Sequence, residues 1–465
     1  MVAINNNKYS NGNLAFKSAE STLIKSLPKK EKTYYGFIKQ RENLSTSRFL
    51  QDVTTNWLPK VVFTRSIADF SEMSFLEYTE SALFYFAPML LAKGFSKAFS
   101  KFAPKNVRNE VKANIAKPTE ELLAHSKLNN NAIVKRSIAA KAAMVLACVS
   151  IPAAEYALSF AKNLLTLKVF KKSDFNNIAN LNKGEKQLED KDQQEKVRKS
   201  AVKHISTATA VSAVSLGASV GLALFGHKSE ALQKVSKGIL RPGKLISKAL
   251  SKFGLKSEKL DKNLNTYINF DCDVKDGKPS LSKGQLVVST VVGFFGYNSA
   301  GKDRGRLDQL EVLTRVPIVV LYTIFGSDAF DWAYKHILLH KGKYSDLIKR
   351  KPNSKSIEKI PESKDLEGLA QKIAKKKNTP VEKEFKRLVK EKAVISAVPY
   401  AFSLLFMGFL LAGISRFWTQ YRFNHGNAKA VKNNKQNTNR SNVKSNNISF
   451  SKSPWKTLQT HSYSN

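Results

Sequence analysis

Cysteine is scarce in this chain: its 465 residues include two. Cys148 lies inside an apolar run and Cys272 in a polar loop, so we expect no disulfide between them and no thiolate metal site. We also expect no cleavable secretory signal, because the first residues contain no continuous apolar stretch. Insertion into a membrane would therefore depend on internal helices.

Acidic residues are few as well. The chain has 37 Asp and Glu against 77 Lys and Arg, which gives a formal net charge of +40. Such a surface attracts anionic lipid head groups or nucleic acid, although Lys and Asn are also frequent where a genome is rich in A and T. The aromatic residues lie in apolar stretches rather than among the basic ones, and no recognition motif appears. Anionic membrane lipid, and not nucleic acid, is therefore the expected partner.

Charge is absent from two long segments, 205–226 and 393–415. A helix of about 20 apolar residues crosses a hydrocarbon core about 30 Å thick, so both segments are predicted to span a membrane. Trp418 and Tyr421 follow the second segment, where aromatic residues mark a lipid–water boundary. These two segments are the strongest indication that the chain enters a membrane.

A third predicted span, 142–161, contains Pro152 and Glu155. An ionisable group in hydrocarbon costs on the order of 3 kcal/mol, so it normally faces a partner or a cavity. We therefore expect that this helix is tilted, is packed in a polar interface between helices, or does not span. The alternative is a transport or proton-relay role for Glu155.

Small residues recur at intervals of four within 205–226, at Ala213, Gly217 and Gly221. Such a ridge lets another helix approach closely, because van der Waals contact at short range holds helices together in lipid. We expect the ridge to pack against a partner helix or a second copy of the chain.

Together these features predict an all-α, multi-pass integral membrane protein with basic amphipathic helices on anionic lipid and a disordered C-terminal tail. The expected location is a bacterial inner membrane or an equivalent one. Lys and Arg are nearly balanced between the two sides of the spans, so they set no orientation. The predicted regions are a polar basic N-terminal region (1–60), an acidic and apolar helix followed by a basic amphipathic helix (61–132), two transmembrane helices with a charged connector (133–226, with spans 142–161 and 205–226), a basic amphipathic region (227–283), short apolar segments that could form a membrane hairpin (284–340), a charged helical linker (341–392), a transmembrane helix with an aromatic flank (393–423) and a disordered basic tail (424–465). Whether 82–92, 286–300 and 316–330 cross the bilayer is left open by their short length.

Gly296, Gly301 and Lys302 fit the pattern G-x-x-x-x-G-K of a phosphate-binding loop, in which backbone amides cradle phosphates. Asp303 stands where the pattern needs the Ser or Thr that holds Mg²⁺, and no strand ending in an acid follows. The segment 296–302 is therefore a degenerate P-loop at best. The alternative is a glycine-rich turn whose Lys302 faces lipid phosphates or water.

Four acids, Asp69, Glu72, Glu77 and Glu80, fall close together in a stretch without basic residues. Carboxylates drawn into a membrane can bind a metal or relay protons. Metal sites in helix bundles usually add a His three residues after a Glu, which is missing here. We expect these acids to meet basic segments of the same chain, for instance 93–105.

His336 and His340 are one helical turn apart, but the acid of an HExxH motif is not between them and no third ligand is visible. We expect these histidines to anchor an apolar segment at the interface, so no metal or other cofactor is predicted. No Ser/His/Asp or Cys/His arrangement stands out. An enzyme is therefore not the expected class, and no catalytic residue is predicted.

The sequence thus favours a structural or interaction role at an anionic membrane. The first alternative is a transporter or channel component that uses Glu155. The second is a membrane-attached nucleotide-binding protein with the degenerate P-loop at 296–302.

Overall fold

The computed structural model describes residues 22–42, 44–129, 131–183, 189–255, 257–268, 272–275, 278–352, 354 and 356–441. Within these ranges nearly all regular structure is helical, as predicted. The one sheet they contain is a hairpin of β1 (Cys272–Lys275) and β2 (Lys278–Leu281), which pair antiparallel with Cys272 opposite Leu281. The chain divides into two compact units, Met1–Ser415 and Arg416–Asn465.

Among the described residues, four helical stretches are long and apolar enough to cross a membrane: Ala132–Phe170, Lys191–Phe225, Arg306–His340 and Val381–Gly426. The predicted spans 142–161 and 393–415 each fall within one of these stretches, and 205–226 extends one residue beyond Lys191–Phe225. The fourth stretch joins α17 (Arg306–Leu321), the π-helical turn η2 (Tyr322–Gly326) and α18 (Ser327–His340). The segment 316–330 therefore belongs to one long helix, although its apolar run alone is short.

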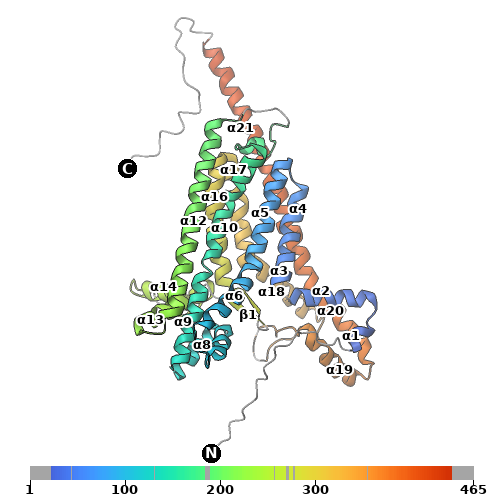
Figure 1. The fold of residues 1–465 in the computed structure, drawn as a ribbon. Coiled ribbons are helices and arrows are strands. Elements are labelled where there is room, and N and C mark those ends of the chain that lie inside the picture. Colours follow the sequence, from blue (N-terminus) through green and yellow to red (C-terminus); the bar gives the residue numbers. More distant parts are fainter. Residues whose placement is uncertain are drawn as a thin grey trace, which may run out of the picture. The chain divides into compact units, whose positions relative to one another are not determined.

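The centre of the first unit is a set of helices packed around α10 (Figure 1). Helix α10 (Ser150–Phe170) contacts α5 (Ile67–Tyr85), α12 (Lys191–Phe225) and α16 (Lys283–Arg304). Much of the predicted span 142–161 is consequently covered by protein: 78% of the most apolar window of Ala132–Phe170 is buried.

Helices α16 and α17 fold back on each other through a single residue, Gly305. Gly305 has φ +126° and ψ 163°, a conformation that glycine adopts and other residues rarely do. The region 284–340 was predicted to contain short apolar segments that could form a membrane hairpin. In the structure, two full helices of this region form a hairpin.

A break at Cys148 separates α9 (Ala132–Ala147) from α10. Pro152 has no backbone N–H, so it cannot donate the helical hydrogen bond to the carbonyl of Cys148. That carbonyl accepts instead from the Ile151 amide at 3.1 Å and from Nε2 of Gln285, on α16, at 3.1 Å. The proline thus explains why the predicted span is two helices rather than one.

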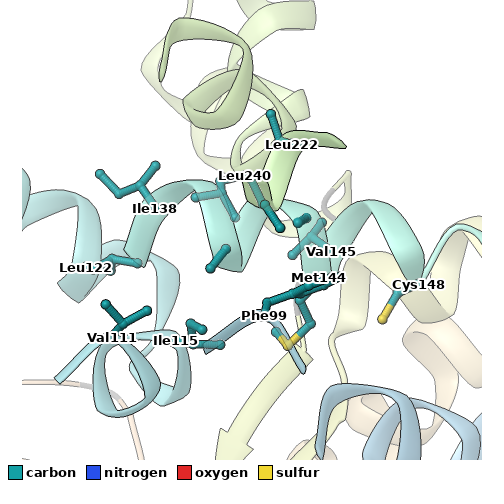
Figure 2. Close-up of a cluster of buried hydrophobic side chains, with 14 of the residues drawn as sticks. Phe99, Val111, Ile115, Leu122, Ile138, Met144, Val145, Cys148, Leu222 and Leu240 are labelled. Carbon is teal, nitrogen blue, oxygen red and sulfur yellow. The ribbon is translucent and has the colours of Figure 1, made fainter. Parts of the chain in front are cut away.

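The largest hydrophobic core surrounds α9 (Figure 2). Val111 and Ile115, from α7 (Arg108–Ala116), lie on one side of α9, and Leu222 and Leu240 lie on the other. Cys148 is buried in the same cluster as a free thiol. The other helices of this part are α6 (Ala87–Lys101), α8 (Thr119–Leu128), α11 (Phe175–Ile178), α13 (Glu230–Leu240), α14 (Pro242–Ser251) and α15 (Glu258–Tyr267).

A second core joins the N-terminal helices to the charged section before the last apolar stretch. Helix α2 (Lys29–Glu42) packs on α20 (Val381–Ser403), and Nζ of Lys392 lies 2.5 Å from Oε1 of Glu42. The region 1–60, expected to be polar and basic, thus contributes the buried side chains of Leu27 and Ile38 to this core. Other elements here are α1 (Thr22–Ser26), α3 (Leu44–Asp52), the π-helical turn η1 (Val53–Trp57), α4 (Leu58–Val62), the 3₁₀ turn η3 (Ser363–Asp365) and α19 (Leu366–Lys377).

The last elements are the π-helical turn η4 (Leu404–Leu410) and α21 (Leu411–Ser441). Helix α21 includes 424–441, which we expected to be disordered. No proline or glycine occurs after Gly426 in that stretch, so nothing in the local sequence ends the helix. The rest of the predicted tail lies outside the described residues.

Candidate functional site

The acids of α5 are turned into the protein rather than toward solvent. Ser66 caps the helix, accepting the amide of Asp69 on its Oγ at 3.0 Å. Asp69, Glu72 and Glu77 are 5–6% exposed. Burial of ionised groups is costly unless they are paired, so their partners decide what this helix does.

Toward its N-terminal half, α5 meets a network in which the charges nearly balance. Arg304, which is 2% exposed, places Nη1 2.5 Å from Oε1 of Glu72 and Nε 2.9 Å from Oδ2 of Asp308. Nζ of Lys162 lies 3.9 Å from Oε2 of Glu72. The same Nη1 of Arg304 donates to Oδ1 of Asn163 at 3.2 Å. This network ties α5, α10, α16 and α17 together.

Arg65 extends this network. Its Nε lies 3.2 Å from Oδ2 of Asp69, and its Nη1 lies 3.1 Å from Oε2 of Glu311. The guanidinium groups of Arg65 and Arg304 lie 5.1 and 5.8 Å from the ring centre of Phe175. The acids of α5 therefore do meet cations of the same chain, but the partners are not the lysines of 93–105 that we expected.

Toward the C-terminal half of α5 the charges do not balance. Glu77 pairs with Lys60 of α4. Oε2 of Glu80 accepts from the Tyr297 hydroxyl at 2.5 Å, and Oδ2 of Asp52 accepts from the Ser81 hydroxyl at 2.5 Å. Together with Glu155 of α10, four carboxyl groups gather here around one lysine. We call Asp52, Glu77, Glu80 and Glu155 the carboxyl cluster.

Glu155 is the most enclosed member, 1% exposed. Its carboxyl group and that of Glu80 line the same cavity, so a proton on one of the two would allow a hydrogen bond between them. Its Oε2 has no hydrogen-bond partner among the described residues. A Cβ at Gly293 of α16 would lie 3.0 Å from Cγ of Glu155, so the glycine leaves the space that this side chain occupies.

The carboxyl cluster lines a cavity of ≈ 70 Å³, with half-buried Arg315 of α17 also in its wall. A second cavity of ≈ 200 Å³ adjoins it, since both share Asp52, Asn56 and Thr323 in their linings. Asp328 of α18 lines the larger one. To hold a water molecule, a cavity must offer roughly 10–15 Å³ and two or more polar partners. Both cavities meet these two conditions.

The three π-helical turns of the described residues meet at the larger cavity. Its lining takes Thr55 and Asn56 from η1, Tyr322 to Ile324 from η2 and Met407 from η4. The hydroxyl of Thr55 donates to the carbonyl of Gln51 at 2.7 Å, which competes with regular helix bonding. Such turns carry an energetic cost and occur often at functional sites.

The structure places the other predicted residues away from this site. Ala213 and Gly217 are exposed on α12, Gly221 is half-buried, and nothing lies within 4 Å of a Cβ added at either glycine. The helix-packing ridge therefore lies open within this chain. Lys141, which the sequence placed too far from Glu155 to neutralise it, donates instead to the carbonyl groups of Ile115 and Lys117 at the end of α7.

Gly296, Gly301 and Lys302 lie inside α16, which is helical from Lys283 to Arg304. A phosphate-binding loop needs free backbone amides, and here these amides belong to a helix. A Cβ at Gly296 would lie 2.9 Å from the carbonyl oxygen of Tyr156, so this glycine lets α16 approach α10. The segment 296–302 is therefore helical and does not form the phosphate-binding loop that the sequence pattern suggested.

His336 and His340 lie on α18, and Nδ1 of His336 is 2.8 Å from the carbonyl oxygen of Trp332. Among the described residues there is no group of three His, Cys, Asp or Glu side chains placed to hold a metal ion.

Glu155, Glu77 and Glu80 were visible in the sequence as unusual acids, but their meeting point was not. Asp52 of α3 completes the carboxyl cluster, and Gly293 and Tyr297 of α16 adjoin it. In the sequence, Tyr297 was only one position of the pattern at 296–302. Comparison with known proteins found no matching family model, no matching curated protein and no matching solved structure.

Proposed function

We propose that this is an integral membrane protein that moves protons through the carboxyl cluster, with Glu155 as the essential proton carrier. One observation carries the proposal: the buried carboxyl of Glu155 lines a small cavity together with Glu80, and its Oε2 has no hydrogen-bond partner among the described residues. The long apolar stretches support insertion into a membrane, which the sequence predicts on independent grounds.

Charge balance supports protons as the mobile species. If all four acids of the carboxyl cluster were ionised, Lys60 and Arg315 would leave the site two charges negative. Water-excluded surroundings disfavour such an excess, so the cluster must hold protons or cations. A single proton on Glu155 or Glu80 would reduce this excess to one negative charge.

The transfer itself needs no other reagent. The O–H bond of the protonated carboxyl breaks, and a new O–H bond forms on the neighbouring carboxylate, so the pair keeps a total charge of −1. Water in the adjoining cavity, lined by Asp52 and Asp328, would supply and remove the proton. The Tyr297 hydroxyl holds Glu80 in place for this exchange.

The test is proton flux into vesicles that contain purified protein, a trapped pH-sensitive dye and an imposed potassium diffusion potential. Wild-type protein should acidify the lumen when the interior is made negative. Glu155→Gln keeps the size of the side chain but cannot ionise, so flux should fall to that of protein-free vesicles. Glu80→Gln should do the same.

Glu195→Gln is the matched control, because Glu195 lies on the surface of α12 and pairs with Arg198. Its flux should equal that of the wild type. The proposal fails if wild-type vesicles acidify no faster than empty ones, or if Glu155→Gln conducts normally. It also fails if flux follows a sodium or potassium gradient and is independent of pH.

The second candidate is the structural or interaction role that the sequence favours. The outward face of α12 supports it: Val211, Val214 and Phe225 are 46%, 72% and 50% exposed beside the small-residue ridge. Such a face suits lipid or a neighbouring transmembrane helix. Extraction of the intact protein by carbonate or high salt would contradict both candidates.

A further inference from the structure

An apolar groove of ≈ 540 Å³ lies between the α9–α10 junction and the helices α13 and α14. Val145, Leu146 and Val149 line it from the junction, and Val235 and Leu245 line it from the opposite helices. The volume lies within the usual range of small-ligand sites. Val145 also belongs to the core shown in Figure 2, so the floor of the groove is fixed by packing.

Among the described residues, nothing covers the outer walls of the groove. Val235 is 52% exposed and Leu245 is 57% exposed. Ile246, Phe253 and Leu255 continue the apolar surface along and beyond α14, the last two at 82% and 59% exposed. Side chains of this size are seldom left in water together, which indicates an occupant.

Positive charge surrounds the groove. Lys234 is in its lining, and the stretch 228–255 has seven basic residues and one acidic residue, Glu230. Arg241 is neutralised by Glu120, whereas Lys234, Lys237, Lys244 and Lys248 are exposed. An apolar slot edged by exposed lysines matches a molecule with an apolar chain and an anionic head.

We propose that this groove binds one acyl chain of an anionic phospholipid, with the head-group phosphate held by Lys234. Two features favour a lipid, rather than a soluble ligand or a protein helix, as the occupant of the groove. Val145, Leu146 and Val149 of its lining belong to Ala132–Phe170, and α12, in Lys191–Phe225, packs against α9 and α13; both stretches are apolar enough to lie in a bilayer. The lysine arrangement also follows the pattern of basic amphipathic helices at membrane surfaces.

The site is independent of the carboxyl cluster, since the two linings have no residue in common. It therefore adds a lipid-binding role to the proposed proton transfer. Proton flux and lipid binding are read by different measurements, so either proposal can fail alone.

The test is photo-cross-linking in phosphatidylcholine vesicles that hold the full chain. One sample contains a small fraction of phosphatidylglycerol with a diazirine in its acyl chain, and a second contains phosphatidylcholine with the same diazirine. Mass spectrometry of the digested protein locates the cross-links. We expect phosphatidylglycerol to label peptides containing Val145–Val149 and Val235–Leu245 more strongly than phosphatidylcholine.

Two variants separate the head group from the chain. Lys234→Glu should lower labelling by phosphatidylglycerol about tenfold, because it replaces one attractive charge with a repulsive one. Val235→Trp should lower labelling by both lipids, since it fills the groove from a half-exposed position. Lys203→Glu and Val214→Trp, on exposed positions of α12 outside the groove, are the matched controls and should label as the wild type does.

Equal labelling by the two lipids would overturn the assignment of Lys234. Labelling spread evenly over the apolar helices, or unchanged by Val235→Trp in protein with a wild-type circular dichroism spectrum, would overturn the groove. An unlabelled groove with cross-links elsewhere would mean that something other than lipid covers it.

Discussion

The Nη1 atom of Arg304 lies 2.5 Å from Oε1 of Glu72, and the two residues are 2% and 5% exposed. They come from α16 and α5, and both side chains touch further polar groups of α10. A pair enclosed in this way holds three helices at fixed positions. It differs from the carboxyl cluster because its charges have partners.

Removing one partner of this pair should destabilise the protein strongly. Glu72→Leu leaves a buried guanidinium with less compensation, so we expect a loss of about 3–5 kcal/mol. The double variant Glu72→Leu/Arg304→Met should lose less, because the guanidinium that Glu72→Leu leaves buried is removed as well, while Lys162 and Asp308 each lose one ion-pair partner. Thermal unfolding of the purified protein, followed by circular dichroism, measures both.

The surface pair Glu195–Arg198 provides the control for this experiment. Glu195→Gln should leave the melting temperature nearly unchanged, since solvent screens exposed pairs. A double variant that is less stable than Glu72→Leu alone would contradict the explanation.

The main helices could be predicted because each carries its own signal. Uncharged runs predict the apolar stretch of α12 and the one that runs from α20 through η4 into α21. Pro152 predicts an interruption of the helix within 142–161. Whether 316–330 belongs to a span was left open, because Arg306–Leu321 begins with charged residues that hide its continuity with this fourth apolar stretch. Local composition records the apolar run but not the helix that extends beyond it.

The site was predictable only in part. Glu155 stood out because one acid in an apolar segment is costly, and this reasoning uses a single residue. Its neighbours Glu80, Tyr297 and Gly293 come from helices far apart in the sequence, so only the packing of α5 and α16 against α10 brings them together. The expectation that 93–105 would neutralise α5 had no distance information and failed for that reason.

Acid should weaken the contact between α20 and the loop after α18. Burial raises the pKa of Asp346, but hydrogen bonds and charge from Arg387 and Lys377 outweigh burial, so the pKa lies below the ordinary value of 3.8. A depressed pKa gives stability that is complete above 3.8 and is lost as the pH falls through the folded-state value. Urea unfolding of wild type and Asp346→Asn should therefore differ at neutral pH and converge in strong acid. A difference that grows below pH 3.8 would contradict this assignment.

The hydrogen bond from Gln285 to Cys148 should depend on Pro152. Gln285→Leu removes one donor to the Cys148 carbonyl, and we expect a loss of about 1 kcal/mol. In a Pro152→Ala background the restored amide of residue 152 can donate to that carbonyl, so the same change should cost less. A double-mutant cycle by thermal unfolding measures the difference. Equal costs in the two backgrounds would show that the proline does not create the need for Gln285.

Space at Gly293 should matter for proton flux more than for stability. In Gly293→Ala the new Cβ would lie 3.0 Å from Cγ and 3.1 Å from Oε1 of Glu155, so the carboxyl group of Glu155 must move. We expect reduced flux in the vesicle assay with a melting temperature close to that of the wild type, because alanine is the better helix former by about 1 kcal/mol. Gly217→Ala, with nothing within 4 Å, gains the same propensity and should keep full flux. Normal flux in Gly293→Ala would indicate that the position of Glu155 is not critical.

A larger side chain on the open ridge of α12 should leave the folding of the single chain unchanged. The same side chain should prevent another helix from packing on the ridge. Nothing within 4 Å opposes a side chain at Gly217, so Gly217→Leu should fold with an unchanged melting temperature in detergent. If the ridge packs on a second copy, the larger side chain keeps the two helices apart, and close van der Waals contact is lost. Val214→Leu is the matched control, because it adds bulk to a residue 72% exposed on the same helix without changing the glycine spacing. Cross-linking in vesicles should then give a dimer for wild type and Val214→Leu but not for Gly217→Leu. A dimer that survives in Gly217→Leu would remove Ala213, Gly217 and Gly221 from the contact and leave this face to lipid.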